Sequence, residues 1–435
     1  MMKILVIGSG GREHALCWGI KKSRGVSRLY CAPGNGGTAE IAHNVPIAAH
    51  QIEELAAFAL RERIGLTVVG PELPLTLGIV DVFEKKGLAI IGPKAAAARL
   101  EGSKIFAKEF MQRHGIPTSP FEKTSSWEQA LKIVRSGRFG YPVVLKADGL
   151  AAGKGVIVAR NEHQAETAIH QLMVEKTLGV AGENLLIEQF LEGVETSFLV
   201  FSDGQTALPM VATQDHKTVF DNDEGPNTGG MGAYSTDEIL KASAFQEVME
   251  RIVNPTIQGM EAEGTPYRGI LYAGLMSTKD GLKVLEYNTR FGDPETQPIL
   301  FRLNSDLVEV FEGICSRDLG TMNLQWTQDA SVCVVLAAGG YPGDFEKGKT
   351  IRGIPEAESL AGVKVFHAGT ENRNGCPVST GGRVLGVTAK AENLSAAISV
   401  AYQAVGRIHF DHMHFRRDIG RKGLRRESLL MKADS

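Results

Sequence analysis

Short apolar runs alternate with helical patterns over the first hundred residues, and this alternation constrains the fold more than any other feature. The apolar runs predict strands at residues 3–7, 29–31, 66–69 and 88–91. Helical patterns separate them, from about Arg12 onward and at residues 52–63 and 77–86. Strands that alternate with helices form a parallel, doubly wound sheet. We therefore expect a Rossmann-like α/β domain over residues 1–103.

A more mixed, α+β pattern follows over residues 104–328. Ser103 is suited to cap a helix that ends near Arg113. A small unit is expected at 121–192, with helices at 126–136 and 162–175 and strands at 143–147, 156–159 and 185–189. Hairpins are expected at 195–212 and 268–288, with turns at Asp203–Gly204 and Asp280–Gly281 and a long helix at about 236–263 between them.

The last unit spans residues 329–425 and is expected to be a mixed α/β domain, followed by a tail at 426–435. Its clearest elements are a strand at 331–338 and a helix near 392–406. A chain of 435 residues exceeds one ordinary hydrophobic core. The fold class is therefore a multidomain protein that combines α/β and α+β units.

Composition and charge exclude several classes of protein. The net charge of −3 gives no basic field for nucleic acid. The five cysteines are scattered and lack CxxC spacing, which favours a reducing compartment over disulfides or zinc. The first residues do not form a signal-peptide pattern, and no apolar stretch is long enough to span a bilayer. We expect a cytoplasmic protein without a nucleic-acid or membrane partner.

A glycine-rich loop, Gly8–Gly11, lies between the first strand and the first helix. Backbone amides at a helix N-terminus attract anions. A dinucleotide is disfavoured, because Glu13 stands at the third glycine position and Cys31–Pro33 offers no acid for a ribose. A substrate phosphate and a tight turn without a ligand both remain open. Asn35–Thr38 is a second such loop at the end of a strand.

Lys146 and the glycine-rich segment Asp148–Gly155 form a candidate nucleotide site. A lysine beside a flexible glycine loop can hold phosphates through charge and backbone amides. The segment lacks the GxxxxGK[ST] pattern, so it is no P-loop. An edge or surface lysine is the ordinary alternative.

Glu286 and Asn288 stand two apart on a predicted strand and therefore share a face. A carboxylate and an amide oxygen suit Mg²⁺, which uses few protein ligands together with substrate phosphates. Arg290 follows, and its planar fork can grip a carboxylate or a phosphate. The alternative is a polar sheet face without a ligand.

Two further segments are less specific when taken alone. The run Gly225–Ser235 is rich in glycine and polar residues, so it is either a site wall or an exposed flexible loop. His409–His414 contains three histidines and Asp411. We favour a strand with alternately exposed histidines there over a zinc or iron site.

Taken together, these segments resemble the phosphoribosylamine–glycine ligases, or glycinamide ribonucleotide synthetases, of the ATP-grasp superfamily. The resemblance runs along nearly the whole chain. It is most specific in GPNTGGMGAY and RFGDPETQ, and it also includes VIGSGGREHAL, APGNGGTA, VGPELPL, LEGSK, KADGLAAGKGV, QDHKTVFDNDE, LYAGLM, EYNTRFGDPE, AAGGYPGD, VFHAGT and GGRVLGV.

The resemblance implies an ATP-grasp core over residues 104–328 with a lid at about 121–192. It implies an ATP site formed by Lys104, Lys146, Gly153, Lys154, Gly155, Glu188, Gln189, Phe190, Leu191, Glu195, Lys217 and Asn227. It implies that phosphoribosylamine is held by Gly10, Gly11, Arg12, Glu13, Asn35, Gly36, Gly37 and Thr38. The implied metal, Mg²⁺ or Mn²⁺, is held by Glu286 and Asn288. The implied catalytic residues are Arg290, Lys146, Asp215 and Asp293.

The chemistry that the resemblance implies has two steps. The glycine carboxylate attacks the γ-phosphate of ATP to give glycyl phosphate and ADP. The amine of 5-phosphoribosylamine then displaces phosphate to give glycinamide ribonucleotide in purine biosynthesis. We expect the protein to act as a monomer on these small molecules.

Two departures from the family pattern bear on the site. Many relatives read HKR where this chain has Thr218 after Lys217, so an arginine near ATP is replaced and Lys217 is the candidate to compensate. The region of a second acidic metal ligand reads Gly274-Leu275-Met276 here. The competing hypotheses are an ATP-grasp carboxylase acting on biotin or a purine precursor, a Rossmann-type oxidoreductase and a nucleotide-binding protein without catalysis.

Overall fold

The computed structural model describes residues 1–150 and 155–425. Its N-terminal domain is a five-stranded parallel sheet in the order β3-β2-β1-β4-β5, which confirms the doubly wound prediction. The strands are β1 (Met2–Gly8), β2 (Val26–Pro33), β3 (His43–Asn44), β4 (Leu66–Val69) and β5 (Ile90–Ile91). The helices are α1 (Gly11–Lys21), α2 (Thr38–Ile41), α3 (Ile52–Glu62), α4 (Glu72–Thr76), α5 (Ile79–Lys85) and α6 (Ala95–Gly102).

The apolar run in β1 is continuous because both faces of the strand are covered. Ile4 and Val6 belong to one buried cluster, and Leu5 and Ile7 belong to another on the opposite face. A parallel strand covered by helices on both sides has no solvent face that would favour polar residues. This burial holds β1 in the middle of the sheet, so the loops that follow the strands keep a fixed position.

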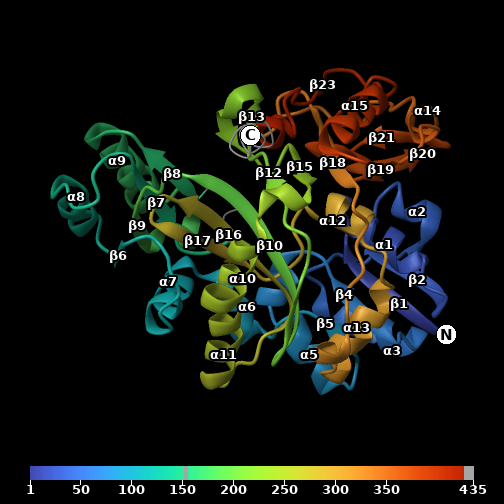
Figure 1. Ribbon diagram of the computed structural model, residues 1–435, viewed down its shortest axis with the longest axis horizontal. Helices are drawn as coiled ribbons and strands as arrows, with labels where there is room; N and C mark the ends of the chain where they lie inside the picture. The colour runs from blue at the N-terminus through green and yellow to red at the C-terminus, as the bar shows by residue number, and fades with distance from the viewer. Residues whose placement is uncertain (151–154, 426–435) are drawn as a thin grey trace.

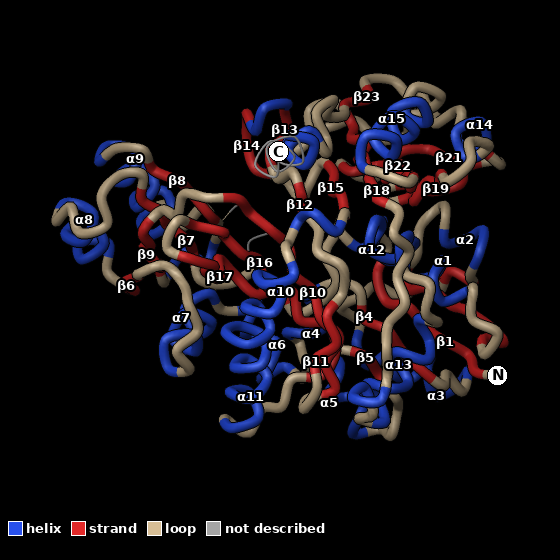
Figure 2. Tube along the Cα trace, viewed as in Figure 1, coloured by secondary structure: helices blue, strands red, loops and turns tan. Residues whose placement is uncertain are grey.

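The lid is a four-stranded antiparallel sheet in the order β6-β9-β7-β8. Its strands are β6 (Phe121–Thr124), β7 (Val143–Ala147), β8 (Val156–Ala159) and β9 (Leu185–Gln189). The last three have the predicted bounds. Helices α8 (Trp127–Arg135) and α9 (Glu162–Ile169) cover its outer side, and the second helix is shorter than predicted because it continues as a π-helix over His170–Val174 (Figure 2).

The central sheet has the antiparallel order β11-β10-β16-β17. Both predicted hairpins are present, as β10 (Val194–Asp203) with β11 (Ala207–Pro209) and β16 (Arg268–Thr278) with β17 (Gly281–Asn288). The capped helix is α7 (Lys104–Arg113), and the Ser103 hydroxyl accepts the amide of Phe106 at 3.1 Å.

The long helix predicted at 236–263 is present over residues 242–262, but it is not a regular α-helix throughout. It is divided into a 3₁₀ turn (Asp237–Ile239), α10 (Ala242–Val248), a π-helical turn (Met249–Val253) and α11 (Asn254–Ala262). Pro255 is the second residue after the π-helical turn and cannot donate a backbone hydrogen bond. The regular helical ladder is interrupted at that point, which is a common setting for a π-helical turn.

The C-terminal sheet recruits strands from the middle of the chain. Its order is β12-β15-β18-β22-β19, with β23 also paired to β18. β15 (Gly232–Ser235) pairs antiparallel with β18 (Ala330–Ala338), so part of the glycine-rich run is built into this sheet. The remaining strands and helices around it are β12 (Gln214–Asp215), β19 (Val363–His367), β20 (Thr370–Arg373), β21 (Cys376–Ser379), β22 (Arg383–Ala391), α12 (Thr296–Arg302), α13 (Leu307–Ser316), α14 (Ile354–Glu358) and α15 (Leu394–Val405).

The free-loop alternative for Gly225–Ser235 is ruled out, and the strand expected at the histidine segment is only partly present. The run Gly225–Ser235 is not a free loop, because its first residues form β14 (Glu224–Asn227), which pairs with β13 (Thr218–Phe220), and its last residues form β15. The histidine segment is not a strand over its length: only β23 (Met413–His414) is one. His412 has a φ of 60°, which turns the chain. The described residues contain no group of three metal-ligating side chains, at this segment or elsewhere.

Figure 1 shows the three regions around a shared centre, with the lid at one end and the N- and C-terminal domains at the other. No helix in the described part of the chain is long and apolar enough to cross a membrane.

A buried joint connects the N-terminal and C-terminal domains. The side-chain amide of Asn35 donates to the backbone carbonyls of Ser9 at 2.9 Å and His367 at 2.8 Å. The His367 amide donates to Nδ1 of His14 at 2.8 Å, so this nitrogen of His14 carries no proton. Gly37 lies between the two histidines, where an added Cβ would come within 2.3 Å of the His14 ring. The close approach of the domains requires glycine at that position.

We predict that Asn35→Ala lowers the free energy of unfolding by about 2–4 kcal/mol, because it leaves buried carbonyls without donors. Urea denaturation of the full chain measures this change. The matched control is Asn184→Ala at an exposed position, which is expected to change stability by less than about 0.5 kcal/mol. Equal stability of the two variants would show that Asn35 does not hold the joint.

Candidate active site

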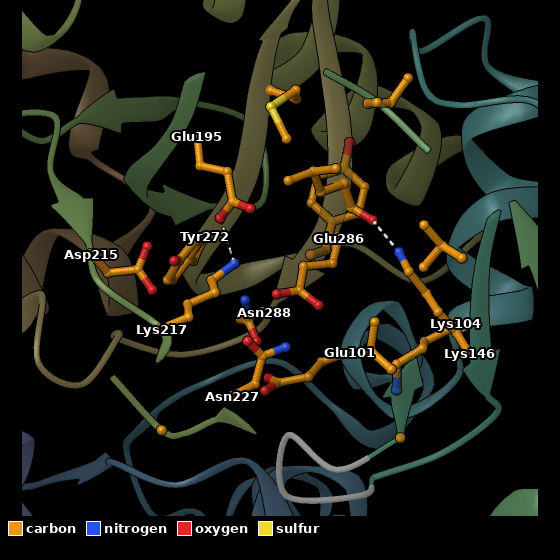
Figure 3. A pocket seen from close by; sticks show the side chains of 18 of the residues that line it. Glu101, Lys104, Lys146, Glu195, Asp215, Lys217, Asn227, Tyr272, Glu286 and Asn288 are labelled. Carbon is orange, nitrogen blue, oxygen red and sulfur yellow. Dashed lines mark hydrogen bonds and ion pairs between the residues drawn. The ribbon is translucent and has the colours of Figure 1, made fainter. Parts of the chain in front are cut away.

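A cleft of about 1570 Å³ lies where the lid, the central sheet and the two outer domains meet. Most of the predicted nucleotide, metal and catalytic residues line it, and Figure 3 labels ten of its lining side chains. The predicted residues on its walls are Lys104, Lys146, Gly155, Glu188, Gln189, Phe190, Leu191, Glu195, Asp215, Lys217, Asn227, Glu286, Asn288, Arg290 and Asp293. Gly153 and Lys154 lie outside the described residues.

The N-terminal loops contribute little to this cleft. Of the eight residues predicted to hold phosphoribosylamine, only Arg12 is among the described residues that line it. The Gly10 amide, predicted as an anion donor, donates to Glu13 Oε2 at 2.5 Å. Glu13 Oε1 pairs with Arg12 Nε at 2.6 Å. The carboxylate of Glu13 therefore caps the helix N-terminus, and Asn35–Thr38 packs into the domain joint.

Lys104 and Lys146 extend into the cleft from α7 and β7. Lys104 Nζ donates to the Gly149 carbonyl at 2.8 Å, at the entrance to the glycine-rich segment. Lys146 Nζ is 2.9 Å from Glu188 Oε1 and 3.2 Å from the Leu285 carbonyl. Burial lowers the pKa of Lys104, with Lys146 adding to the effect and Glu286 opposing it. The two lysines form one cationic wall.

Glu286 and Asn288 are neighbours on β17 and point toward the same space, with the two lysines on one side and Lys217 on the other (Figure 3). Glu286 is opposite Gly274 in the ladder, and a Cβ there would come within 3.3 Å of the Glu286 side chain. The missing side chain at Gly274 leaves room for the carboxylate. Burial raises the pKa of Glu286, but the cations, with Lys217 and Lys146 the strongest, outweigh it and lower the pKa overall. The ionised carboxylate and the amide oxygen fit a divalent cation.

Asp215 and Lys217 form the opposite wall. Lys217 Nζ is 2.9 Å from Glu195 Oε2, and both side chains are partly exposed to the cleft. Burial raises the pKa of Asp215 to about 7, and the nearby carboxylates, chiefly Glu295, act in the same direction against Lys217. An ionised Asp215 therefore gains from any additional cation in this part of the cleft.

Arg290 is held by two carboxylates that the sequence did not single out. Its Nε is 3.1 Å from Glu72, and its Nη2 is 2.8 Å from Glu101. Its Nη2 also donates to Asn288 Oδ1 at 3.2 Å. These contacts fix the plane of the guanidinium and link it to the metal-binding candidate Asn288. Burial alone would lower the pKa of Arg290, but Glu101 and Glu72 raise it, so the side chain stays cationic.

Asp293 and Glu295 have different partners. Asp293 Oδ2 pairs with Arg383 at 3.1 Å, and its Oδ1 accepts from Gln297 at 2.9 Å. Glu295 Oε1 accepts from the Tyr272 hydroxyl at 2.7 Å. Asp293 thus anchors Arg383 of the C-terminal domain. Glu295 instead acts on Asp215, because its negative charge raises the pKa of that carboxyl.

The two most specific sequence runs pack against each other. Gly230 has a φ of 108°, and an added Cβ would lie 2.5 Å from the Pro294 side chain. The Gly229 amide donates to the Tyr341 hydroxyl at 3.0 Å. The glycines are needed for this close contact, which brings Asn227 to the wall of the cleft.

Thr218, where the resemblance to the family leads us to expect arginine, also lines the cleft. Arg416 donates to its hydroxyl at 2.8 Å and to its carbonyl at 3.2 Å. Arg416 is completely buried, so it does not itself replace a cation in the cleft. Lys217, the neighbour of Thr218, is paired with Glu195 and is one of the cations that line the cleft.

Several lining residues were absent from the sequence prediction. Glu72, Glu101, Glu295 and Arg383 lie within runs that resemble the family, but nothing in the sequence indicates their partners. Lys108 lies in a helical pattern of alternating charge, where a solvent-exposed lysine is the usual interpretation. It is instead buried beside Glu188 at 2.9 Å.

We predict that Glu286→Ala lowers kcat/KM for ATP by at least about 10³-fold while the protein stays folded, because a divalent cation loses its carboxylate ligand. Steady-state kinetics and circular dichroism measure the two effects. Glu261→Ala, at an exposed helical position, is the control and is expected to keep full activity. Full activity of the Glu286 variant would remove this residue from the metal site.

Known proteins match the chain along almost its entire length. Family models of phosphoribosylglycinamide synthetase match its N domain at residues 2–101, its ATP-grasp (A) domain at 102–296 and its C domain at 331–422. The phosphoribosylamine–glycine ligase of Vibrio vulnificus YJ016 is 51% identical over 98% of this chain and 99% of its own. That of Escherichia coli K12 is 51% identical over 98% of this chain and 100% of its own.

Solved structures agree with these matches. Phosphoribosylamine–glycine ligase from Thermotoga maritima superposes with a TM-score of 0.82 and 34% identity, over 96% of this chain and 99% of its own. A biotin carboxylase from Campylobacter jejuni has a TM-score of 0.71 at 16% identity, over 95% of this chain and 93% of its own, so it shares only the fold. By its three matched domains and its full-length relatives, this chain belongs to the phosphoribosylamine–glycine ligase family of ATP-grasp enzymes.

Proposed function

We propose that this chain uses ATP to couple glycine to 5-phosphoribosylamine, through glycyl phosphate, and releases glycinamide ribonucleotide, ADP and phosphate. One observation carries the proposal. The cleft combines a lysine wall at Lys104 and Lys146, oxygen ligands at Glu286 and Asn288, and a separate acidic wall at Asp215. These are the groups that phosphoryl transfer to an amino acid needs.

In the first step, Lys104 and Lys146 hold the ATP phosphates, and the segment Glu188–Leu191 at the end of β9 lies beside the adenine with Glu195 at the ribose. Glu286 and Asn288 hold Mg²⁺ or Mn²⁺, which neutralises charge on the phosphates. Arg290 faces the transferred phosphoryl group or the attacking carboxylate. Its two carboxylate partners hold it in one orientation, so little reorganisation is needed when charge develops.

The amino acid lies on the acidic side of the cleft. Asp215 pairs with the glycine ammonium, and Glu295 adds to the negative field. Asp293 contributes indirectly, because it holds Arg383 at the wall of the cleft. The ammonium and carboxylate of glycine are thereby directed toward walls of opposite charge.

In the second step, the amine of phosphoribosylamine attacks the acyl phosphate and phosphate leaves. Closure of the lid keeps water from this hydrolysable intermediate. Arg12 reaches the cleft from the N-terminal domain and is the residue of that domain best placed to meet the phosphoribosyl group. We infer a monomer in the cytoplasm, in line with five free cysteines.

Release of ADP with glycine, phosphoribosylamine and Mg²⁺, each omitted in turn, tests this proposal. We expect turnover only with all three present. Turnover that needs bicarbonate and not glycine would instead identify an ATP-grasp carboxylase.

A second prediction concerns the glycine site. Asp215→Asn is expected to raise the KM for glycine by at least about tenfold, through loss of a buried ion pair, and to change the KM for ATP little. The pKa of Asp215 is raised to about 7, so its ionised form grows as pH rises through 7. In the unsubstituted protein the KM for glycine should therefore fall between pH 6 and pH 8, and this fall should vanish in the variant.

Asp280→Asn, at the exposed tip of a hairpin, is the matched control and should keep the parent kinetics. If Asp215→Asn raised the KM values for glycine and ATP equally, Asp215 would not belong to the glycine site.

A further inference from the structure

Lys108 lies beneath the lysine wall and has no part in the two steps above. It projects from α7, and its side chain is 2% exposed. Its Nζ is 2.6 Å from the Thr118 hydroxyl, 2.8 Å from the Ser119 hydroxyl and 2.9 Å from Glu188 Oε2. An ammonium group has three N–H donors. All three are satisfied inside the protein, so Lys108 has none left for a ligand.

Glu188 connects Lys108 to Lys146. Its Oε2 also accepts from the Ser119 hydroxyl at 2.7 Å, and its Oε1 lies 2.9 Å from Lys146 Nζ. Lys146 has a second partner in the Leu285 carbonyl at 3.2 Å. Lys146 therefore has one hydrogen bond and one ion pair inside the protein, and it lines the cleft with N–H donors left for a ligand.

The charge of this trio depends on Lys108. Two ammonium groups and one carboxylate carry a net charge of +1, all within side chains exposed by 9% or less. Without Lys108, Glu188 and Lys146 form a neutral pair, and the field at the phosphates weakens. Charges act strongly here because water is largely excluded.

We propose that Lys108 is a positioning residue for the nucleotide: by neutralising Glu188, it leaves the positive charge of Lys146 available to the phosphates of ATP. This inference rests on the proposed nucleotide site but not on the identity of the other substrates. The alternative is a purely structural role, in which Lys108 only connects α7 to β9. The experiments below distinguish the two roles.

The pH dependence follows from the surroundings of Lys108. Glu188 on β9 and Lys146 on β7 face it, the Phe121 ring on β6 lies 5.9 Å from its Nζ, and Lys104 is one turn away on its own helix. Burial lowers the pKa of Lys108 to about 8, with Lys146 adding to the effect and Glu188 opposing it. The cation is thus lost as pH rises through about 8. Bound phosphates favour the cationic form of Lys108, so the protein should take up protons when a nucleotide binds near this pH.

Calorimetric titration of the full chain with ADP and with adenosine tests the proposal without requiring turnover. Lys108→Met should weaken ADP binding on the order of tenfold and leave adenosine binding unchanged, since adenosine has no phosphates. Lys123→Met, at an exposed lid position, is the matched control. An equal loss for both ligands, or no loss for ADP, would overturn the proposal.

The double variant Lys108→Met/Glu188→Gln restores the net charge of +1 through Lys146 alone. We expect it to bind ADP more tightly, relative to adenosine, than Lys108→Met does, whereas a structural role predicts a further loss. If the variants do not fold, the pH dependence of nucleotide binding by the unsubstituted protein tests the proposal. Its ADP affinity must fall above about pH 8 while its adenosine affinity does not, and parallel pH profiles would refute the inference. A failed glycine requirement in the ADP-release assay would leave these results intact, so the two proposals fail separately.

Discussion

Several cations of the cleft are paired with carboxylates, from the buried Lys146 to the partly exposed Lys217, and the site depends on this pairing. Glu72 and Glu101 hold Arg290, Glu188 holds Lys146, Glu195 holds Lys217 and Asp293 holds Arg383. An unpaired buried charge costs several kcal/mol, so a cleft with this many cations requires nearby anions. The pairs also hold the side chains in fixed orientations, so donors are in place before phosphates arrive.

These pairs bring the domains together. Glu72 comes from the N-terminal domain, Arg290 from the segment after β17 and Arg383 from the C-terminal domain. The pairing of β15 with β18 and the buried joint at Asn35 keep the outer domains in register with the central sheet. The lid is attached to the same centre through the ion pair of Lys108 with Glu188 and the hydrogen bond from Lys146 to the Leu285 carbonyl.

Local patterns predicted much of the fold, and long-range contacts account for what they missed. The strands at 66–69, 143–147, 156–159 and 185–189 have their predicted bounds, because apolar runs and flanking turn residues define them locally. The entry of β15 into the C-terminal sheet could not be predicted, since its partner lies about a hundred residues away. Likewise, Asn35 looks like a ligand-binding loop residue until His367 is seen beside it. Glu286 and Asn288 were found from their spacing, whereas Lys108 gave no signal because its burial depends on β9.

The central claim is that the cleft transfers the γ-phosphoryl group of ATP to a carboxylate of glycine. Turnover with glycine labelled with ¹⁸O in its carboxylate, followed by mass spectrometry of the released phosphate, tests it most directly. A glycyl phosphate intermediate requires one labelled oxygen to pass from glycine to each phosphate. Unlabelled phosphate, with the oxygen that leaves the glycine carboxylate found in water instead, would contradict the account.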